Sequence, residues 1–182
     1  MSATSRSCAR SAALAAAFAA ALANGSVAAP PLPAAVVPLL PEARVQGSGE
    51  LTWYGLPIYT GHLWSADGSF AFDEPFALDL HYKRELAGRR IAERSVEEMA
   101  KLGADASDLA RWGGAMARIF PDVRDGDRIV GVHVPGRGAS FFHNGRPLGT
   151  IDDAGFARAF FGIWLDPRTS EPALRRRLLG RP

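Results

Sequence analysis

Cysteine is almost absent from this chain of 182 residues: its one cysteine is Cys8, close to the N-terminus. No disulfide can therefore form within the chain, and a zinc site built from several thiolates is excluded. The histidines show no metal-ligand spacing such as His-x-x-x-His, so the sequence predicts no metal site. They stand at positions 62, 81, 133 and 143. Such a chain depends on a hydrophobic core, and its length suits one domain.

A hydrophobic run long enough to cross a bilayer, about 20 residues, is also missing. The apolar run from Ser11 to Ala23 is shorter, follows a basic start and precedes Ser26-Val27-Ala28, which fits the small-x-small cleavage rule. This pattern predicts a signal peptide over residues 1–28 and a periplasmic or secreted protein after cleavage near Ala28. A short membrane anchor is the alternative. In either case, we expect the chain to contact a membrane only through the uncleaved segment 1–28.

Neither sign of charge is in strong excess. The chain has 21 basic and 19 acidic residues, and Arg6 and Arg10 lie in the predicted signal. After cleavage, 19 basic and 19 acidic residues remain, so the basic sequence pI belongs largely to the signal. Because no basic patch or recognition motif accompanies them, the sequence predicts no nucleic-acid partner.

Common catalytic and cofactor-binding motifs are missing as well. Ser140 is not the centre of a Gly-x-Ser-x-Gly elbow, because Phe142 stands where the second glycine is required. The pair Gly47-x-Gly49 continues as strand and lacks the third glycine of a dinucleotide-binding loop. No P-loop is present, so we expect no cofactor. Three aspartates crowd one loop without the order of a calcium loop, and turn formation explains them better: Asp122, Asp125 and Asp127.

Strand and helix patterns follow an irregular start. Residues 29–44 are rich in Ala and Pro and are predicted to form a linker or an irregular lead-in. Strands are predicted at 45–64 (with Pro57 indicating an edge or a bulge), 75–86, 128–134, 138–143 and 146–151. Helices are predicted from Gly88 to a cap at Gly103, from Asp105 to a stop at Pro121, and over 155–165 and 171–179. Asn144-Gly145 predicts a hairpin turn. This order indicates an α+β fold, an antiparallel sheet with helices over one face.

Three segments together resemble one family: GSGELTWYGLPIYTGHLW (47–64), PFALDLHYKRELAGRRIAERSVEEM (75–99) and GTIDDAGFARAFFGIWLDPRTSEPALRRRLLG (149–180). A fourth, Ile119 to Val123 with Gly126-Asp127, joins them. In their order and spacing the chain resembles the chalcone isomerase-like family, in its bacterial exported branch, with the domain over residues 45–182. The resemblance implies an open-faced β-sandwich, with a cleft between sheet and helices for a planar or long apolar ligand. Plant members cyclise chalcones there, and related non-catalytic members hold fatty acids.

The resemblance also implies where a site lies and that most of its catalytic groups are missing. Catalytic members carry an arginine after a Gly-Ala-Gly-like turn, and that position falls at Leu51, which has no donor. The family's hydroxyl falls near Tyr54, with Thr52 close by, and Arg44 takes the arginine role if the alignment shifts. No counterpart exists for the tyrosine and asparagine of the following helix. The expected ligand contacts are Leu51, Trp53, Tyr54, Tyr59 and Ile163.

Three hypotheses about function follow. The first is a non-catalytic protein that binds an apolar or amphipathic small molecule, fatty-acid-like or phenolic. The second is an intramolecular lyase of the chalcone isomerase type, and the third is a scaffold that meets another protein or the membrane. The aromatic residues of segment 47–64 fit either a cleft lining or ordinary core. An apolar exposed patch favours the third hypothesis.

Overall fold

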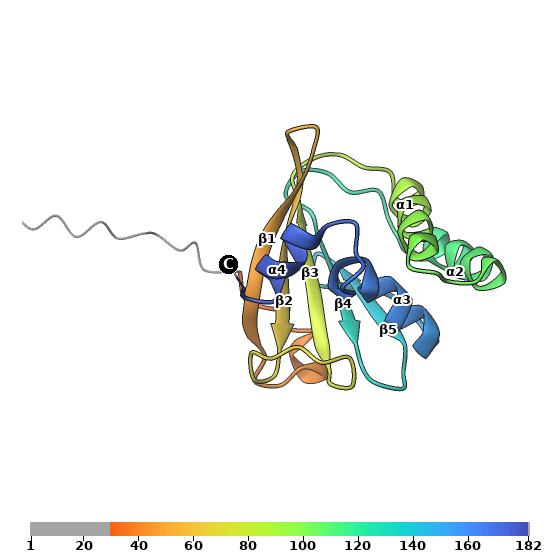
Figure 1. Cartoon of the computed structure of the whole chain (residues 1–182). Helices are drawn as coiled ribbons and strands as arrows, with labels where there is room; N and C mark the ends of the chain where they lie inside the picture. Colours follow the sequence, from red (N-terminus) through yellow and green to blue (C-terminus); the bar gives the residue numbers. More distant parts are fainter. Residues whose placement is uncertain (1–29, 182) are drawn as a thin grey trace, which may run out of the picture.

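The sheet has six antiparallel strands, each hydrogen-bonded to the next strand in the chain. A computed structural model describes residues 30–181, so the predicted signal peptide lies outside the described residues. The strands are β1 (Arg44–Trp53), β2 (Leu56–Ser65), β3 (Phe76–Tyr82), β4 (Arg128–His133), β5 (Ala139–His143) and β6 (Arg146–Ile151). Figure 1 shows them running side by side in an open sheet.

Four α-helices occur in two pairs, and they cover one face of the sheet. The helices α1 (Gly88–Lys101) and α2 (Ala106–Ile119) follow β3, and α3 (Ala154–Leu165) and α4 (Pro172–Leu178) follow β6. In Figure 1, α3 and α4 lie across the sheet and α1 and α2 lie beside them. The predicted α+β fold with helices on one face is therefore confirmed. Each helix of the described part, residues 30–181, is too short or too polar to span a bilayer.

The helix-side core is dominated by phenylalanine. Phe76 and Phe141 come from the sheet, Phe156 and Phe161 from α3, and each is at most 1% exposed. They meet edge to face, an arrangement that aromatic rings favour. At Gly131 a β-carbon would lie 3.1 Å from the Phe161 ring, so the missing side chain lets α3 approach β4 closely. These side chains of α3 thus pack the helix against β3, β4 and β5.

The segment predicted as one strand over 45–64 is instead a hairpin, and this part of the prediction is wrong. Strand β1 ends at Trp53, and the chain reverses at Tyr54 and Gly55, whose φ angles are 49° and 76°. A two-residue turn with both φ angles positive matches the twist of the two strands, but it is normally marked by Asn-Gly or Asp-Gly. Here tyrosine takes the place of the asparagine or aspartate, so the sequence carries no turn signal at this point. The bulge expected near Pro57 is present, because the register shifts between Leu51 and Thr52 opposite it.

Because the chain reverses at Tyr54 and Gly55, Tyr59 lies on β2, after the turn. It lies opposite Leu51 in the β1–β2 ladder, and both side chains pack into the helix-side core. Trp53 and Tyr54 stand at the end of the hairpin, exposed to solvent.

The Ala/Pro-rich lead-in covers the other face of the sheet. It is irregular, as expected, with one short 3₁₀ helix, η1 (Val37–Leu39). It is not a free linker, because Val36 and Leu40 are 0% and 2% exposed. Their partners in a second hydrophobic cluster are Trp64, Ala77, Val130, Val132 and Phe142. Arg128 Nη1 also donates to the carbonyl oxygen of Pro31 at 2.9 Å. Both clusters form within residues 30–181, so this part of the chain contains its own core.

Candidate functional site

Three side chains form a row across β1, β2 and β3 on the helix side of the sheet. Leu51 pairs with Tyr59, and Tyr59 pairs with Tyr82 on the next strand. The two tyrosine rings meet edge to face with their centroids 5.9 Å apart. Tyr59 and Tyr82 are buried, and Leu51 is half-buried at the edge of the sheet. The row therefore has a closed aromatic end and an apolar end that reaches solvent.

The helices place a few polar groups over this row. The indole Nε1 of Trp164, on α3, donates a hydrogen bond of 2.8 Å to the Tyr59 hydroxyl oxygen. Burial raises the pKa of Tyr59, so its hydroxyl stays neutral at physiological pH. A neutral phenol can donate or accept a hydrogen bond, but it is a poor nucleophile and a poor base. Tyr59 thus suits binding better than acid–base chemistry.

A buried carboxylate lies near Tyr59, and two cations pair with it. Glu98 on α1 is 7% exposed and accepts hydrogen bonds from Lys101 Nζ (2.8 Å) and Ser170 Oγ (2.5 Å). Burial alone would raise its pKa, but these donors, with the charges of Arg94 and Lys101, hold the pKa below its usual value. Glu98 is therefore ionised and paired, which makes it a support for the helices rather than a proton carrier.

Arg94, on α1, lies near enough to Tyr59 for its positive charge to lower the pKa of the phenol slightly, against the larger effect of burial. It contacts the carboxylates of Glu97, at 3.1 Å, and Glu98, and its Cζ lies 5.6 Å from the centre of the Trp53 ring. Two carboxylates therefore compensate its charge. The resemblance implies that the family's arginine position falls at Leu51, and the row Leu51, Tyr59 and Tyr82 itself supplies no cation to polarise a substrate carbonyl.

The structure brings together only some of the residues predicted from the sequence. Leu51 and Tyr59 lie in the row, and Ile163 is half-buried next to Trp164 on α3. Trp53 is 58% exposed beside Arg94, while Tyr54 is 92% exposed at the turn and Thr52 is exposed on β1.

Arg44 is far from these residues. It begins the ten-residue strand β1, and at roughly 3.3 Å per residue it lies about 30 Å from Trp53. The structure therefore does not place Arg44 and Tyr54 in one site.

Three residues of the site were missed as site residues by sequence reasoning: Tyr82, Glu98 and Trp164. Tyr82 and Trp164 fit the core patterns of their strand and helix, so nothing local set them apart. Glu98 carried a signal, because it stands three or four residues from Arg94 and Lys101 on one helix face. Its pairing on both sides indicates a fixed carboxylate.

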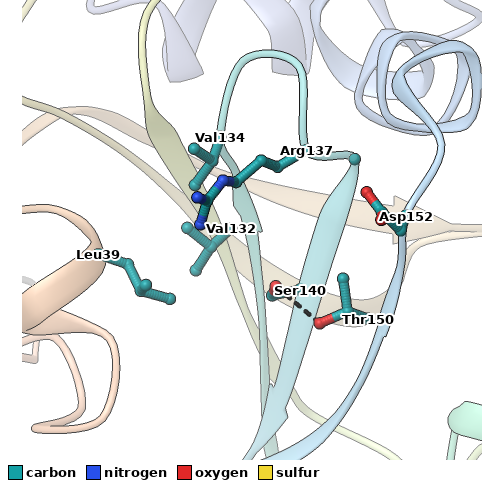
Figure 2. A pocket seen from close by; sticks show the side chains of 8 residues that line it. Leu39, Val132, Val134, Arg137, Ser140, Thr150 and Asp152 are labelled. Carbon is teal, nitrogen blue, oxygen red and sulfur yellow. Dashed lines mark hydrogen bonds between the residues drawn. The ribbon is translucent and has the colours of Figure 1, made fainter.

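Two hollows occur elsewhere on the described surface. One, of about 430 Å³, lies on the lead-in side of the sheet, where Leu39 approaches β4, β5 and β6. Figure 2 shows Val132, Val134 and Arg137 on one side of it and the hydrogen-bonded pair Ser140 and Thr150 on the other. The second, of about 270 Å³, lies between the α1–α2 turn and α3. Neither is lined by Leu51 or Tyr59.

A charged cluster is buried on the lead-in side. Asp79 is 0% exposed and receives two hydrogen bonds from Arg128, of 2.7 and 2.6 Å, with His81 Nε2 at 3.1 Å. Burial alone would raise the pKa of Asp79, but its hydrogen bonds to His81 and Arg128 lower it. Because Arg128 also binds Pro31, this cluster fixes the lead-in to β3 and β4.

Two aspartates of the α2–β4 loop, Asp122 and Asp127, accept hydrogen bonds from backbone amides. Asp122 accepts from the amide of Gly88 at the start of α1, and Asp127 accepts from Asn144 Nδ2 and the amide of Arg124. Among the residues described, no group of three or more His, Cys, Asp or Glu side chains is arranged to hold a metal ion. Asp127 therefore stabilises the turn before β4, as inferred, whereas Asp122 joins the loop to the start of α1.

Comparison with known proteins gives matches of three kinds. A sequence model of the chalcone isomerase-like family matches residues 53–180. An uncharacterized protein of Haemophilus influenzae is 32% identical over 136 residues, which is 74% of this chain and 67% of that protein. The crystal structure of a fatty-acid-binding protein of Arabidopsis thaliana superimposes with a TM-score of 0.60, at 13% identity, over 76% of this chain and 87% of that one. At that identity the superposition shows a shared fold.

Proposed function

The chain belongs to the chalcone isomerase-like family, and we propose that it is a non-catalytic member that binds an apolar or amphipathic small molecule. The proposed place is the helix side of the sheet, at the solvent end of the row Leu51–Tyr59–Tyr82. The observation that carries the proposal is the composition of this row: an apolar and aromatic wall with a neutral phenol. The fold match to a plant fatty-acid-binding protein supports the ligand class.

The expected contacts divide by polarity. The apolar part of the ligand lies against Leu51, Tyr59 and Ile163, where the half-buried side chains of Leu51 and Ile163 leave room to adjust. The polar head lies at the rim, where the side chain of Arg94 is 51% exposed next to Trp53. Small-molecule sites commonly combine a mostly apolar lining with a few polar groups that fix orientation.

Entry of a ligand requires movement, because Tyr59 and Tyr82 are 8% and 4% exposed and the row is covered at this end. The β1–β2 hairpin is the expected moving part: β1 is an edge strand, and the row ends at this edge. The movement is expected beyond Gly49, because α4 packs closely there: a β-carbon at Gly49 would meet Leu174 at 2.7 Å. We expect the hairpin to shift away from α1 and expose Leu51 and Ile163 when a ligand enters.

Catalysis is the less supported alternative. In chalcone cyclisation a phenolate attacks and an enolate develops, so donors placed at the developing charge carry the rate, typically by a factor of about 10²–10³ each. Here Leu51 supplies no donor, and Arg94 is compensated by Glu97 and Glu98. We propose binding without turnover.

We also propose that the protein acts outside the cytoplasm. The basic start, the apolar run and the small-x-small motif that ends at Ala28 support export of the chain and its release as a protein that begins near Ala29. A periplasmic or secreted carrier of a poorly soluble molecule is consistent with this leader.

The experiment is a calorimetric titration of residues 29–182 with dodecanoate and, separately, with 2′-hydroxychalcone. We expect saturable binding of at least one of them. Ile163→Trp fills the proposed place and is expected to weaken binding at least tenfold, since added side-chain volume removes the room for the ligand. The matched control is Leu39→Trp, which adds volume to the hollow on the lead-in side and leaves affinity unchanged.

The opposite pattern locates a ligand elsewhere. Loss of affinity in Leu39→Trp but not in Ile163→Trp would move the site to the hollow of Figure 2 and contradict the proposal. Circular dichroism of both variants checks that they fold, so that a loss of affinity reports on the site.

A further inference from the structure

The β1–β2 hairpin ends in an exposed apolar tip, which we define as residues Trp53, Tyr54 and Leu56. Their side chains are 58%, 92% and 54% exposed, and the Trp53 and Tyr54 rings stack with their centroids 5.9 Å apart. Large aromatic side chains present roughly 150–250 Å² each, so the two rings leave about 300 Å² open to solvent. A single apolar patch of this size on a monomer is often functional.

The shape of the tip restricts what can cover it. In Figure 1 the hairpin projects beyond the ends of the neighbouring strands and beyond α1. Tyr54 occupies the turn at φ 49°, a left-handed conformation that costs a non-glycine residue energy and that asparagine or glycine would adopt more easily. The Tyr54 side chain extends into solvent, so the protein's own packing does not account for a large aromatic ring at this position.

The charges around the tip favour an electrically neutral partner. Residues 51–57 contain no charged side chain. Behind them, Lys83 pairs with Glu50 at 2.7 Å, and Arg94 pairs with Glu97. Arg84, the next cation along the chain, is followed by Glu85. A nucleic acid or a strongly anionic surface needs an excess of cations, and this neighbourhood offers charges in balanced pairs.

We infer that the tip inserts into the headgroup region of a zwitterionic phospholipid bilayer. Tryptophan and tyrosine prefer this depth, because their rings are apolar and their N–H or O–H groups can still meet water or phosphate. The paired ions around the tip match a layer of paired phosphate and ammonium groups. Insertion stands independently of any ligand bound at the row, although it would place the solvent end of that row close to the lipid.

The test uses residues 29–182, which contain both cores and exclude the apolar run of the leader, with vesicles of phosphatidylcholine. The double variant Tyr54→Asn, Leu56→Thr removes two tip side chains and keeps Trp53 as a reporter, while asparagine suits the turn. We expect the unchanged chain to float with the vesicles and its tryptophan emission to shift to shorter wavelength, since Trp53 is the exposed one of its four tryptophans. Partition is expected to be at least tenfold weaker in the double variant. Val37→Ser, which removes an apolar group 48% exposed on the lead-in, is the matched control and keeps full partition.

Four results would overturn the inference. In the first, the unchanged chain does not partition into the vesicles, and in the second, the double variant partitions as strongly as the unchanged chain. In the third, the chain binds only to anionic vesicles and is released by 0.5 M salt. In the fourth, the chain forms a concentration-dependent dimer that the double variant abolishes. The last would assign the tip to a second copy of the chain. Dodecanoate titration without vesicles separates the two proposals, because a chain that binds dodecanoate and ignores vesicles refutes insertion alone.

Discussion

The packing of the lead-in makes a sharp prediction about stability. Leu40 is 2% exposed in the cluster with Val36 and Trp64, on the face of the sheet that the helices leave open. Replacing a buried leucine by alanine costs about 2–5 kcal/mol, and less where the surroundings can collapse. Because Leu40 lies in an irregular segment that can adjust, we expect Leu40→Ala to lower the free energy of unfolding by about 2–3 kcal/mol, a large part of the roughly 5–15 kcal/mol of a typical domain.

The assay is urea denaturation of residues 29–182, followed by circular dichroism. With a slope of about 2 kcal/mol per molar, the midpoint is expected to fall by about 1–1.5 M. The neighbouring Leu39 is 38% exposed, and Leu39→Ala serves as the control, with an expected loss below about 1 kcal/mol. If the two variants have the same midpoint as the unchanged chain, the lead-in does not pack on the sheet and the account of this face is wrong.

Other predictions concern the core, a helix cap, processing and turnover. Phe160→Ala, at a side chain 6% exposed between sheet and helices, is expected to cost about 3–5 kcal/mol in the same assay, and a loss below 1 kcal/mol would place Phe160 outside the core. Partial burial opposes ionisation of Asp153, but hydrogen bonds from Trp112, the Phe156 amide and Arg111 lower its pKa to about 2. Its folded pKa lies below the ordinary 3.8, so its stabilisation is complete above about pH 4 and lost toward pH 2. Asp153→Asn should therefore cost about 1–2 kcal/mol at pH 6 and much less at pH 2, where the folded carboxyl is half protonated, and a pH-independent difference would exclude this ionisation. N-terminal sequencing of protein from its host should start at or within two residues of Ala29, whereas an intact Met1 on membrane-bound protein contradicts processing. Chiral chromatography should find 2′-hydroxychalcone cyclised no faster than without protein, and stereoselective turnover would show that catalytic groups were overlooked.

The order of elements was predictable because local signals marked most boundaries. The Asn144-Gly145 turn adopts positive φ angles, as its sequence indicates, and joins β5 to β6. The apolar run 155–165 matches α3 to within one residue at its start. In contrast, Tyr54-Gly55 forms a turn of the same kind without the usual asparagine. The sequence pattern therefore predicted one strand where the structure has the β1–β2 hairpin.

Contacts between distant segments were beyond local reasoning. Val36 and Leu40 sit among alanines and prolines, and nothing in that composition shows that they cover the sheet. Tyr59 and Trp164 are 105 residues apart, so their hydrogen bond follows from the way α3 crosses the sheet. The family resemblance supplied the position of Leu51, but the compensation of Arg94 by Glu97 and Glu98 required the folded helix α1.

Native mass spectrometry of the chain purified from its own host tests the central claim most directly. We predict that the unchanged protein carries one amphipathic small molecule, identifiable by its mass after release, and that Ile163→Trp protein purified in the same way carries none. A bare chain mass for both proteins, with no adduct after addition of dodecanoate or 2′-hydroxychalcone, would contradict a ligand site at the row Leu51–Tyr59–Tyr82.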